Sequence, residues 1–123
     1  MSDTPRARLF TPAEANTLLP KIKPIVAHIL AKAGEARSLM ALGSSVAREA
    51  RVEGLEVEVR TAIESIEEMG CQFKDWNFQL GLVDFPARIN GQDVLLCWRS
   101  DEPSVAHYHT HDGGYAGRKP IQG

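Results

Sequence analysis

Three of the four histidines of this chain lie at alternate positions near its C-terminus, in the stretch "VAHYHTHDGG". They are His107, His109 and His111. Alternate residues of a β-strand point to the same face, so in a strand the three imidazoles would share one face. Imidazole nitrogens suit zinc, nickel, iron or copper rather than calcium or magnesium. The spacing therefore predicts a transition-metal site, and the alternative is a polar strand face that binds nothing.

Strand geometry limits how many of these histidines can hold one ion. The outer two are four residues apart, which is about 13 Å along a strand at 3.3 Å per residue. We therefore expect two of them to be ligands of one ion and the third to be free, unless the strand bulges near Thr110.

Other polar residues are candidates for completing such a site. As further ligands, or as partners that orient a histidine, we name Asp84, Cys97 and Asp112. Cys97 with His109 would also suit a nucleophile and its base, although a thiol in the middle of a sheet is more often structural. Arg99 and Arg118 are candidates for binding an anion, and for Arg118 a solvated charge is the alternative.

Residues 12–69 have the pattern of a helical hairpin. "TPAE" at 11–14 supplies a capping box and a proline at the first helical position. Apolar residues then recur at alternating spacings of four and three as far as Met40, which favours one helix kinked at Pro20 or Pro24. "GSS" at 43–45 breaks this run, and a second seam follows from Val52 to Met69.

Residues 71–112 have the pattern of an antiparallel sheet of about three strands. "LVDFPARI" and "DVLLCWR" flank Asn90-Gly91, which indicates a hairpin with a type I′ turn. That turn pairs Val83 with Trp98 and leaves one face wholly apolar. The missing N–H of Pro86 would face away from the partner strand, which places this strand at a sheet edge.

The mixed face of that hairpin would carry Asp84, Cys97 and Arg99. "VAHYHTH" at 105–111 is the expected third strand, with its histidines on the same mixed face. Glycine-rich residues 113–123 are expected to form a C-terminal loop.

These elements predict a single α+β domain over residues 1–123, in which a long antiparallel helical hairpin packs on a small antiparallel β-sheet. The helices are long for so small a sheet, so part of their seam would lack a partner within the chain. We therefore expect a homodimer that pairs helices between subunits. The alternative to a metal-binding protein is a non-enzymatic homodimeric interaction module that uses the hairpin. The sequence predicts no particular reaction or small-molecule ligand.

Composition argues against some partners. The net charge is −2 and the isoelectric point is about 6.1, so no global positive field would draw the protein to nucleic acid or to an anionic membrane. "MSDTPRARLF" at the N-terminus lacks the apolar run of a signal peptide or a membrane span, and we expect a cytoplasmic protein. In a reducing cytoplasm, the simplest interpretation of its two cysteines, Cys71 and Cys97, is that they are buried thiols.

Three stretches carry a resemblance to a known family: "RLFTPAEANTLLPKIKPIV", "GLVDFPARINGQDVLLCWRSDEPSVAHYH" and "GYAGRKPI". They resemble a prokaryotic family catalogued as domain of unknown function 2203, over nearly the whole chain. The family brings no established activity, so the resemblance supports the architecture alone. It implies that His109 matches a histidine of the family, whereas His107 stands where an aromatic residue is usual and His111 where the family varies. By the same resemblance, Asp84, Arg99 and Arg118 join His109 as the positions of greatest interest.

Overall fold

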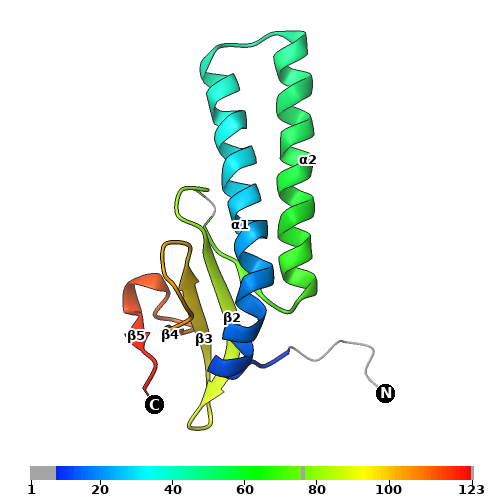
Figure 1. Ribbon diagram of the computed structural model, residues 1–123. Coiled ribbons are helices and arrows are strands. Elements are labelled where there is room, and N and C mark those ends of the chain that lie inside the picture. The colour runs from blue at the N-terminus through cyan, green and yellow to red at the C-terminus, as the bar shows by residue number, and fades with distance from the viewer. Residues whose placement is uncertain (1–7, 76, 123) are drawn as a thin grey trace, which may run out of the picture.

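The computed structural model describes residues 8–75 and 77–122, and it begins with two long antiparallel helices (Figure 1). α1 spans Pro12–Ala41 and α2 spans Val46–Glu68. The Thr11 hydroxyl accepts from the Glu14 backbone N–H at 3.1 Å, and the Glu14 carboxylate accepts from the Thr11 N–H at 2.9 Å. The predicted helical hairpin and the capping box that starts it are both confirmed.

α1 continues through Pro20 and Pro24 as a single helix. Both prolines lie on its exposed face, so the seam packs without interruption. The buried residues of α1 follow the predicted spacing: Ala15, Leu19, Ile22, Val26, Ile29 and Ala36. Neither of the two described helices combines the length and the apolar character that crossing a membrane requires.

The second half of the chain forms one antiparallel sheet with the strand order β1-β2-β3-β4-β5. The strands are β1 Gln72–Phe73, β2 Leu82–Ile89, β3 Gln92–Arg99, β4 His107–Thr110 and β5 Lys119–Pro120. The β2–β3 hairpin has the predicted register along its whole length. Asn90 and Gly91 have φ values of 51° and 79°, and a type I′ turn requires positive φ at both central residues.

Within the described residues the sheet has five strands rather than about three. β1 and β5 have two residues each, and two residues are too few for an alternating pattern to be visible in a sequence. The tail at 113–123 is therefore not only a loop: it contains a 3₁₀ turn, η1 at Tyr115–Gly117, and then β5, which pairs with β4. β1 pairs with Val83 and Asp84, so β2 is not an edge strand at those two residues.

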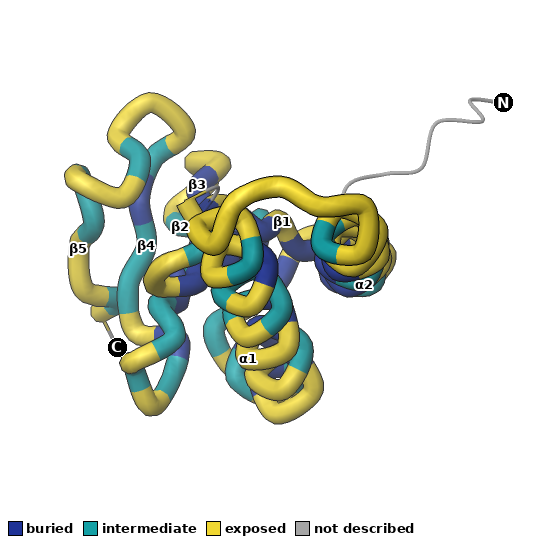
Figure 2. Tube along the Cα trace, turned by 90° about the horizontal axis from the view of Figure 1, so that it is seen from above, coloured by how far each residue is buried: buried dark blue, intermediate teal, exposed yellow. Residues whose placement is uncertain are grey.

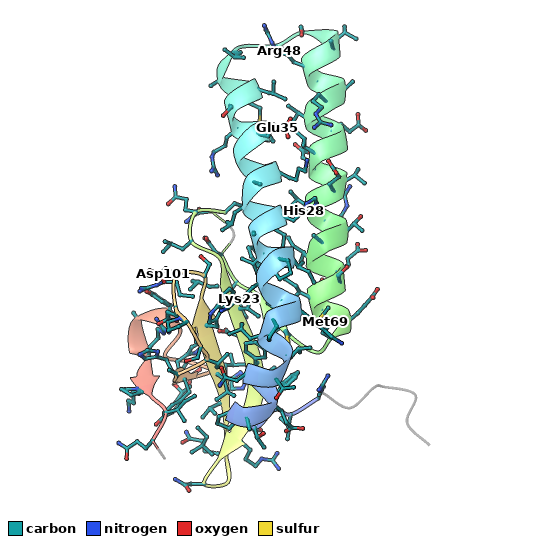
Figure 3. The ribbon with its side chains drawn as sticks, viewed as in Figure 1. Lys23, His28, Glu35, Arg48, Met69 and Asp101 are labelled. Atoms are coloured by element: carbon teal, nitrogen blue, oxygen red, sulfur yellow. The ribbon has the colours of Figure 1, made fainter. Side chains whose placement is uncertain are left out.

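The sheet packs its apolar face against the helices (Figure 2). The sheet contributes Val83, Phe85, Ala87, Val94, Leu96 and Trp98 to a single hydrophobic core with the helix seams. Asn16 of α1 fixes the start of the β4 segment, because its amide donates to the Val105 carbonyl at 3.1 Å and accepts from the Val105 N–H at 2.8 Å. The far half of the hairpin, where Glu35 and Arg48 lie, extends beyond the sheet (Figure 3).

One buried carboxylate holds the connection between β1 and β2. Asp75 Oδ2 accepts backbone N–H groups from Gln79, Leu80 and Gly81 at 2.8, 2.6 and 2.9 Å. Gly81 has a φ of 75°, and a Cβ there would lie 2.6 Å from Cγ1 of Val26. Glycine thus lets the loop approach α1 closely, and this approach fixes where β2 begins, at Leu82, two residues before Asp84.

Candidate metal centre

The three histidines have three different environments. His109 is buried in β4, with 4 % of its surface exposed. His107 lies on the same strand but is only half-buried, and its Nδ1 lies 3.4 Å from a carboxylate oxygen of Glu102. His111 follows the end of β4 and is exposed. The structure therefore does not bring the three imidazoles together around one point.

The structure instead brings His109 together with two of the other candidates. One ligand atom each from Asp84, Cys97 and His109 lies within 4.8 Å of the others, and all three residues are buried. The strand register explains this meeting. Asp84 of β2 is directly opposite Cys97 of β3, while His109 of β4 is opposite Leu95, two residues from Cys97 on the same face. Asp112 lies exposed in the turn after β4 and is not part of the cluster.

The hydrogen bonds of His109 determine where its proton lies. Nδ1 is 2.7 Å from the carbonyl oxygen of Thr110, and a carbonyl only accepts, so Nδ1 carries the hydrogen. The other nitrogen, Nε2, lies 3.2 Å from Oδ2 of Asp84. A neutral imidazole protonated at Nδ1 has a lone pair at Nε2, and a carboxylate oxygen also offers a lone pair. These two atoms attract each other only if a proton or a cation lies between them.

Burial favours the neutral forms of the two acidic members of the cluster, Asp84 and Cys97. Burial raises the pKa of the Asp84 carboxyl, and the nearby His109 offsets only part of that effect. Burial, with the adjacent Asp84 carboxyl, raises the pKa of the Cys97 thiol to about 12. Oδ1 of Asp84 is also buried without a hydrogen-bond partner of ordinary geometry among the described residues. A bound cation would act in the opposite direction, because it favours the ionised forms of both groups.

The raised thiol pKa argues against the alternative in which Cys97 is a nucleophile and His109 its base. A nucleophilic cysteine reacts as the thiolate, and reactive cysteines have lowered pKa values in partly exposed, electropositive sites. Cys97 is 1 % exposed and its pKa is raised. Both ring nitrogens of His109 contact oxygen atoms of Thr110 and Asp84.

A cavity of about 220 Å³ adjoins the cluster. Besides the cluster itself, its lining residues are Lys74, Leu82, Leu95, His111, Gly114 and Tyr115. His111 and Tyr115 are exposed, so the cavity reaches the surface on the side where the tail passes β4. An ion held by the three buried atoms would therefore have one side open to a small molecule or to water.

The two candidate anion-binding arginines both have acidic partners within the chain. Arg118 Nη2 lies 2.6 and 2.8 Å from the two carboxylate oxygens of Glu102 and 3.3 Å from the Cys97 carbonyl. Arg99 pairs with Asp101 and donates to the Tyr115 hydroxyl. Anion binding by either arginine stays a prediction, and an incoming anion would compete with a carboxylate already in place. Arg118 instead supports the backbone that carries Cys97.

Sequence reasoning did not identify Glu102 or Thr110 as parts of this region. Glu102 accepts from Arg118 and from the Arg99 backbone N–H, at 2.7 Å in the second case, and so ties the β3–β4 connection to the tail. The only sequence signal was an acidic residue in the turn "SDEPS". Thr110 acts through its backbone carbonyl, and no side-chain pattern reports such a contact.

Comparison with known proteins adds a family and no activity. No curated protein and no solved structure matches the chain. One family model matches residues 8–121, a span that contains both helices, all five strands and every residue of the cluster. The chain therefore belongs to the family described as an uncharacterized conserved protein, domain of unknown function 2203.

Proposed function

We propose that this protein binds one transition-metal ion through a carboxylate oxygen of Asp84, the sulfur of Cys97 and Nε2 of His109. The observation that carries the proposal is the buried meeting of these three ligand atoms within 4.8 Å. A cation there would also resolve the contact between two lone pairs at Nε2 and Oδ2, which lie 3.2 Å apart.

Charge and donor type favour zinc among the candidates. A thiolate and a carboxylate together balance a divalent ion, so the loaded site would be neutral, as burial requires. Sulfur, nitrogen and oxygen donors at one site suit zinc, and three protein ligands with one open position are typical of zinc sites that bind a further molecule. Nickel, iron and copper accept the same donors and rank after zinc.

The surroundings support these ligands in the way that metal sites require. A ligating histidine usually donates its other N–H to a carbonyl or a carboxylate, which fixes the ring and the tautomer. The Thr110 carbonyl takes this role for His109. The Arg118 guanidinium, held by Glu102, donates to the Cys97 carbonyl and so fixes the strand at the sulfur ligand.

The proposal places the protein in the cytoplasm. Its two cysteines, Cys71 and Cys97, are free buried thiols, and free thiols persist in reducing compartments. A thiolate ligand needs the same conditions, because an oxidised sulfur would no longer bind the ion.

The test is the metal content of protein purified without a histidine tag, followed by titration of the metal-free protein with zinc. We expect one ion per chain. Cobalt in place of zinc should give the near-ultraviolet charge-transfer band of a cobalt–thiolate bond. That band should disappear in Cys97→Ser and remain in Cys71→Ser, a matched control because Cys71 is equally buried but lies outside the cluster.

The histidines provide a second comparison. His109→Ala should remove most of the affinity for zinc, whereas His107→Ala and His111→Ala should leave it nearly unchanged. Calorimetry that detects no zinc binding to the wild-type protein at neutral pH would refute the proposal. Binding that survives His109→Ala but not His111→Ala would place the ion elsewhere.

A further inference from the structure

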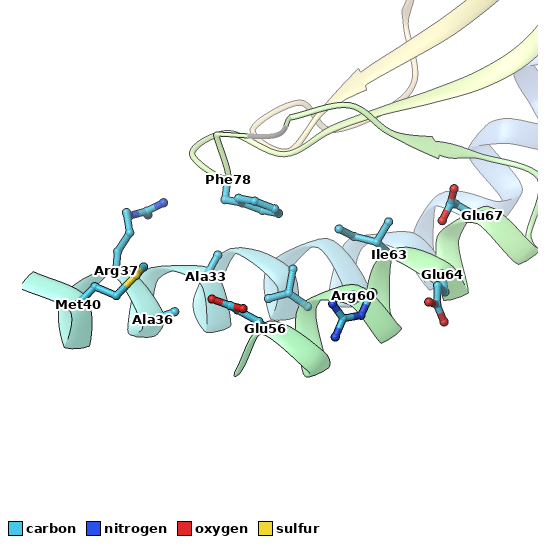
Figure 4. A pocket seen from close by; sticks show the side chains of 11 residues that line it. Ala33, Ala36, Arg37, Met40, Glu56, Arg60, Ile63, Glu64, Glu67 and Phe78 are labelled. Atoms are coloured by element: carbon cyan, nitrogen blue, oxygen red, sulfur yellow. The ribbon is translucent and has the colours of Figure 1, made fainter. Parts of the chain in front are cut away.

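The hairpin carries an apolar groove that runs from the β1–β2 connection and the end of α2 toward the tip of the hairpin. A cavity of about 560 Å³ lies between α1, α2 and Phe78 of the β1–β2 connection (Figure 4). Its floor is apolar, with Ala33 and Ala36 from α1 and Val59 and Ile63 from α2. The two alanines leave room along α1 that larger side chains would fill.

The groove continues toward the tip of the hairpin. A second cavity, of about 380 Å³, shares Met40 and Glu56 with the first. Apolar side chains are unusually exposed near this end: Met40 is 56 %, Leu42 is 65 % and Val46 is 86 % exposed. A long groove that ends in exposed apolar residues fits an extended occupant such as a helix better than a small molecule.

The charges of the two helices indicate which helix would fit. α1 carries four lysine or arginine residues and two glutamates, and so has a net charge of +2. α2 carries three arginines and seven glutamates, and so has a net charge of −4. Along the groove, Arg37 stands on the α1 side, while Glu56, Glu64 and Glu67 stand on the α2 side with Arg60 (Figure 4).

We propose that this groove is the interface with a second copy of this chain. A two-fold axis that runs along the groove, parallel to the helices, places α1 of each copy beside α2 of the other, so the basic helix meets the acidic helix twice. The four helices then alternate in charge around a bundle, and the apolar floors of both grooves and the exposed tips become buried between the copies. The inference rests on the helices alone and is independent of metal binding.

The test is the molecular mass in solution, by light scattering and by sedimentation at micromolar concentration. We expect a dimer whose dissociation constant rises with salt, because opposite charges meet at the interface. Ala33→Glu places a charge on the groove floor and should raise the dissociation constant at least about tenfold, since a buried unpaired charge is costly. Ala31→Glu is the matched control, because Ala31 is exposed on the same helix and does not line the groove.

A second pair of variants avoids the core altogether. Arg37 and Lys21 are both exposed residues of α1, and only Arg37 lines the groove. Arg37→Glu should weaken the dimer, and Lys21→Glu should not. A wild-type protein that is monomeric at micromolar concentration would overturn the proposal, as would a dimer that both groove variants leave unchanged. An unaltered far-ultraviolet circular dichroism spectrum and melting transition in Arg37→Glu would show that the variant is folded.

Discussion

Zinc binding at the cluster must release a proton from Cys97, and the size of this effect can be worked out from the structure. The pKa of the Cys97 thiol is raised from an ordinary 9.0 to about 12 by burial and by Asp84. The thiol therefore stays protonated at pH 7 and at pH 8, whereas the metal binds the thiolate. Each ion bound displaces this proton, so affinity falls as the pH falls.

The raised pKa also sets the scale of the affinity. Three pKa units at 1.36 kcal/mol each make the thiolate about 4 kcal/mol harder to form than an ordinary one. Structural zinc sites in small peptides bind with about 10–16 kcal/mol at pH 7. Subtracting the extra cost leaves about 6–12 kcal/mol, which corresponds to dissociation constants between roughly tens of micromolar and a few nanomolar.

The assay is calorimetric titration at pH 8 in buffers that differ in ionisation enthalpy, which counts the protons released per ion. We expect at least one proton for the wild-type protein, and a zinc affinity that rises about tenfold for each pH unit between 7 and 9. Any Asp84 that is still protonated at the working pH would add to this count, because burial raises the pKa of that carboxyl too.

Two variants show whether the proton comes from Cys97. Cys71→Ser should release as many protons as the wild type, although burial raises the pKa of the Cys71 thiol to about 12 as well. Cys97→Ser should release one proton fewer and bind more weakly. Zinc binding with no proton release at pH 8 would refute the reasoning, because the sulfur would then not be a ligand.

Three further predictions concern stability, measured by chemical denaturation of the metal-free protein. Burial raises the folded pKa of Asp84, so the wild type should lose stability as the pH rises from the ordinary carboxyl value through the raised one. Asp84→Asn should remove this loss of stability, so at pH 8 the variant should be at least as stable as the wild type, and it should bind zinc more weakly. A variant less stable than the wild type at pH 8 would show that the contact between Asp84 and His109 is a net favourable ion pair. Asp75→Asn should cost about 2–4 kcal/mol at pH 7, because three backbone N–H groups lose a charged acceptor. Burial raises the pKa of Asp75, but the hydrogen bonds from the N–H groups of Gly81, Leu80 and Gln79 outweigh this effect, and the net pKa is lowered. The stability cost of Asp75→Asn should therefore shrink as the pH falls through the ordinary carboxyl value of 3.8 and below. A cost that does not depend on pH would contradict this origin. Gly81→Ala should cost about 2–4 kcal/mol, from left-handed backbone and overpacking against Val26. Gly91 also has a positive φ but has open space around it, so Gly91→Ala should cost only about 1–2 kcal/mol. Equal losses of stability in Gly81→Ala and Gly91→Ala would contradict the overpacking against Val26.

The helices and the central hairpin could be predicted because their signals are local. A capping box, an unbroken seam and Asn90-Gly91 each act within a few residues, and the turn alone sets the register of both flanking strands. β1 and β5 could not be predicted, because two-residue strands form only where the sheet offers them an edge. The loop around Asp75 depends on one carboxylate that meets backbone N–H groups, which no periodicity reveals.

The sequence could predict which face of the sheet carries the candidate site, but not which side chains on that face would come together as ligands. Alternation placed His107 and His109 on the face that carries Asp84 and Cys97, and the structure has them there. Which histidine meets the carboxylate depends on how β4 registers against β3. That register is set by contacts distant in sequence: Asn16 with Val105, and Arg118 with Glu102. His111 falls beyond the end of the strand, where alternation no longer applies.

The two borders of the sheet have a consequence for how copies of this protein can aggregate. An exposed strand edge is a template on which another chain can add a strand. At one border, β1 covers only two residues of β2. Beyond β1, Pro86 of β2 offers no N–H, and the Pro86 carbonyl already accepts a hydrogen bond from the Phe10 N–H at 2.7 Å. At the other border β5 consists of Lys119 and Pro120, a charge and a residue without a donor. Among the described residues, neither border presents the continuous row of donors and acceptors that fibril growth by strand addition needs. Misassembly through the sheet therefore first requires the tail, or the backbone at Phe10, to detach.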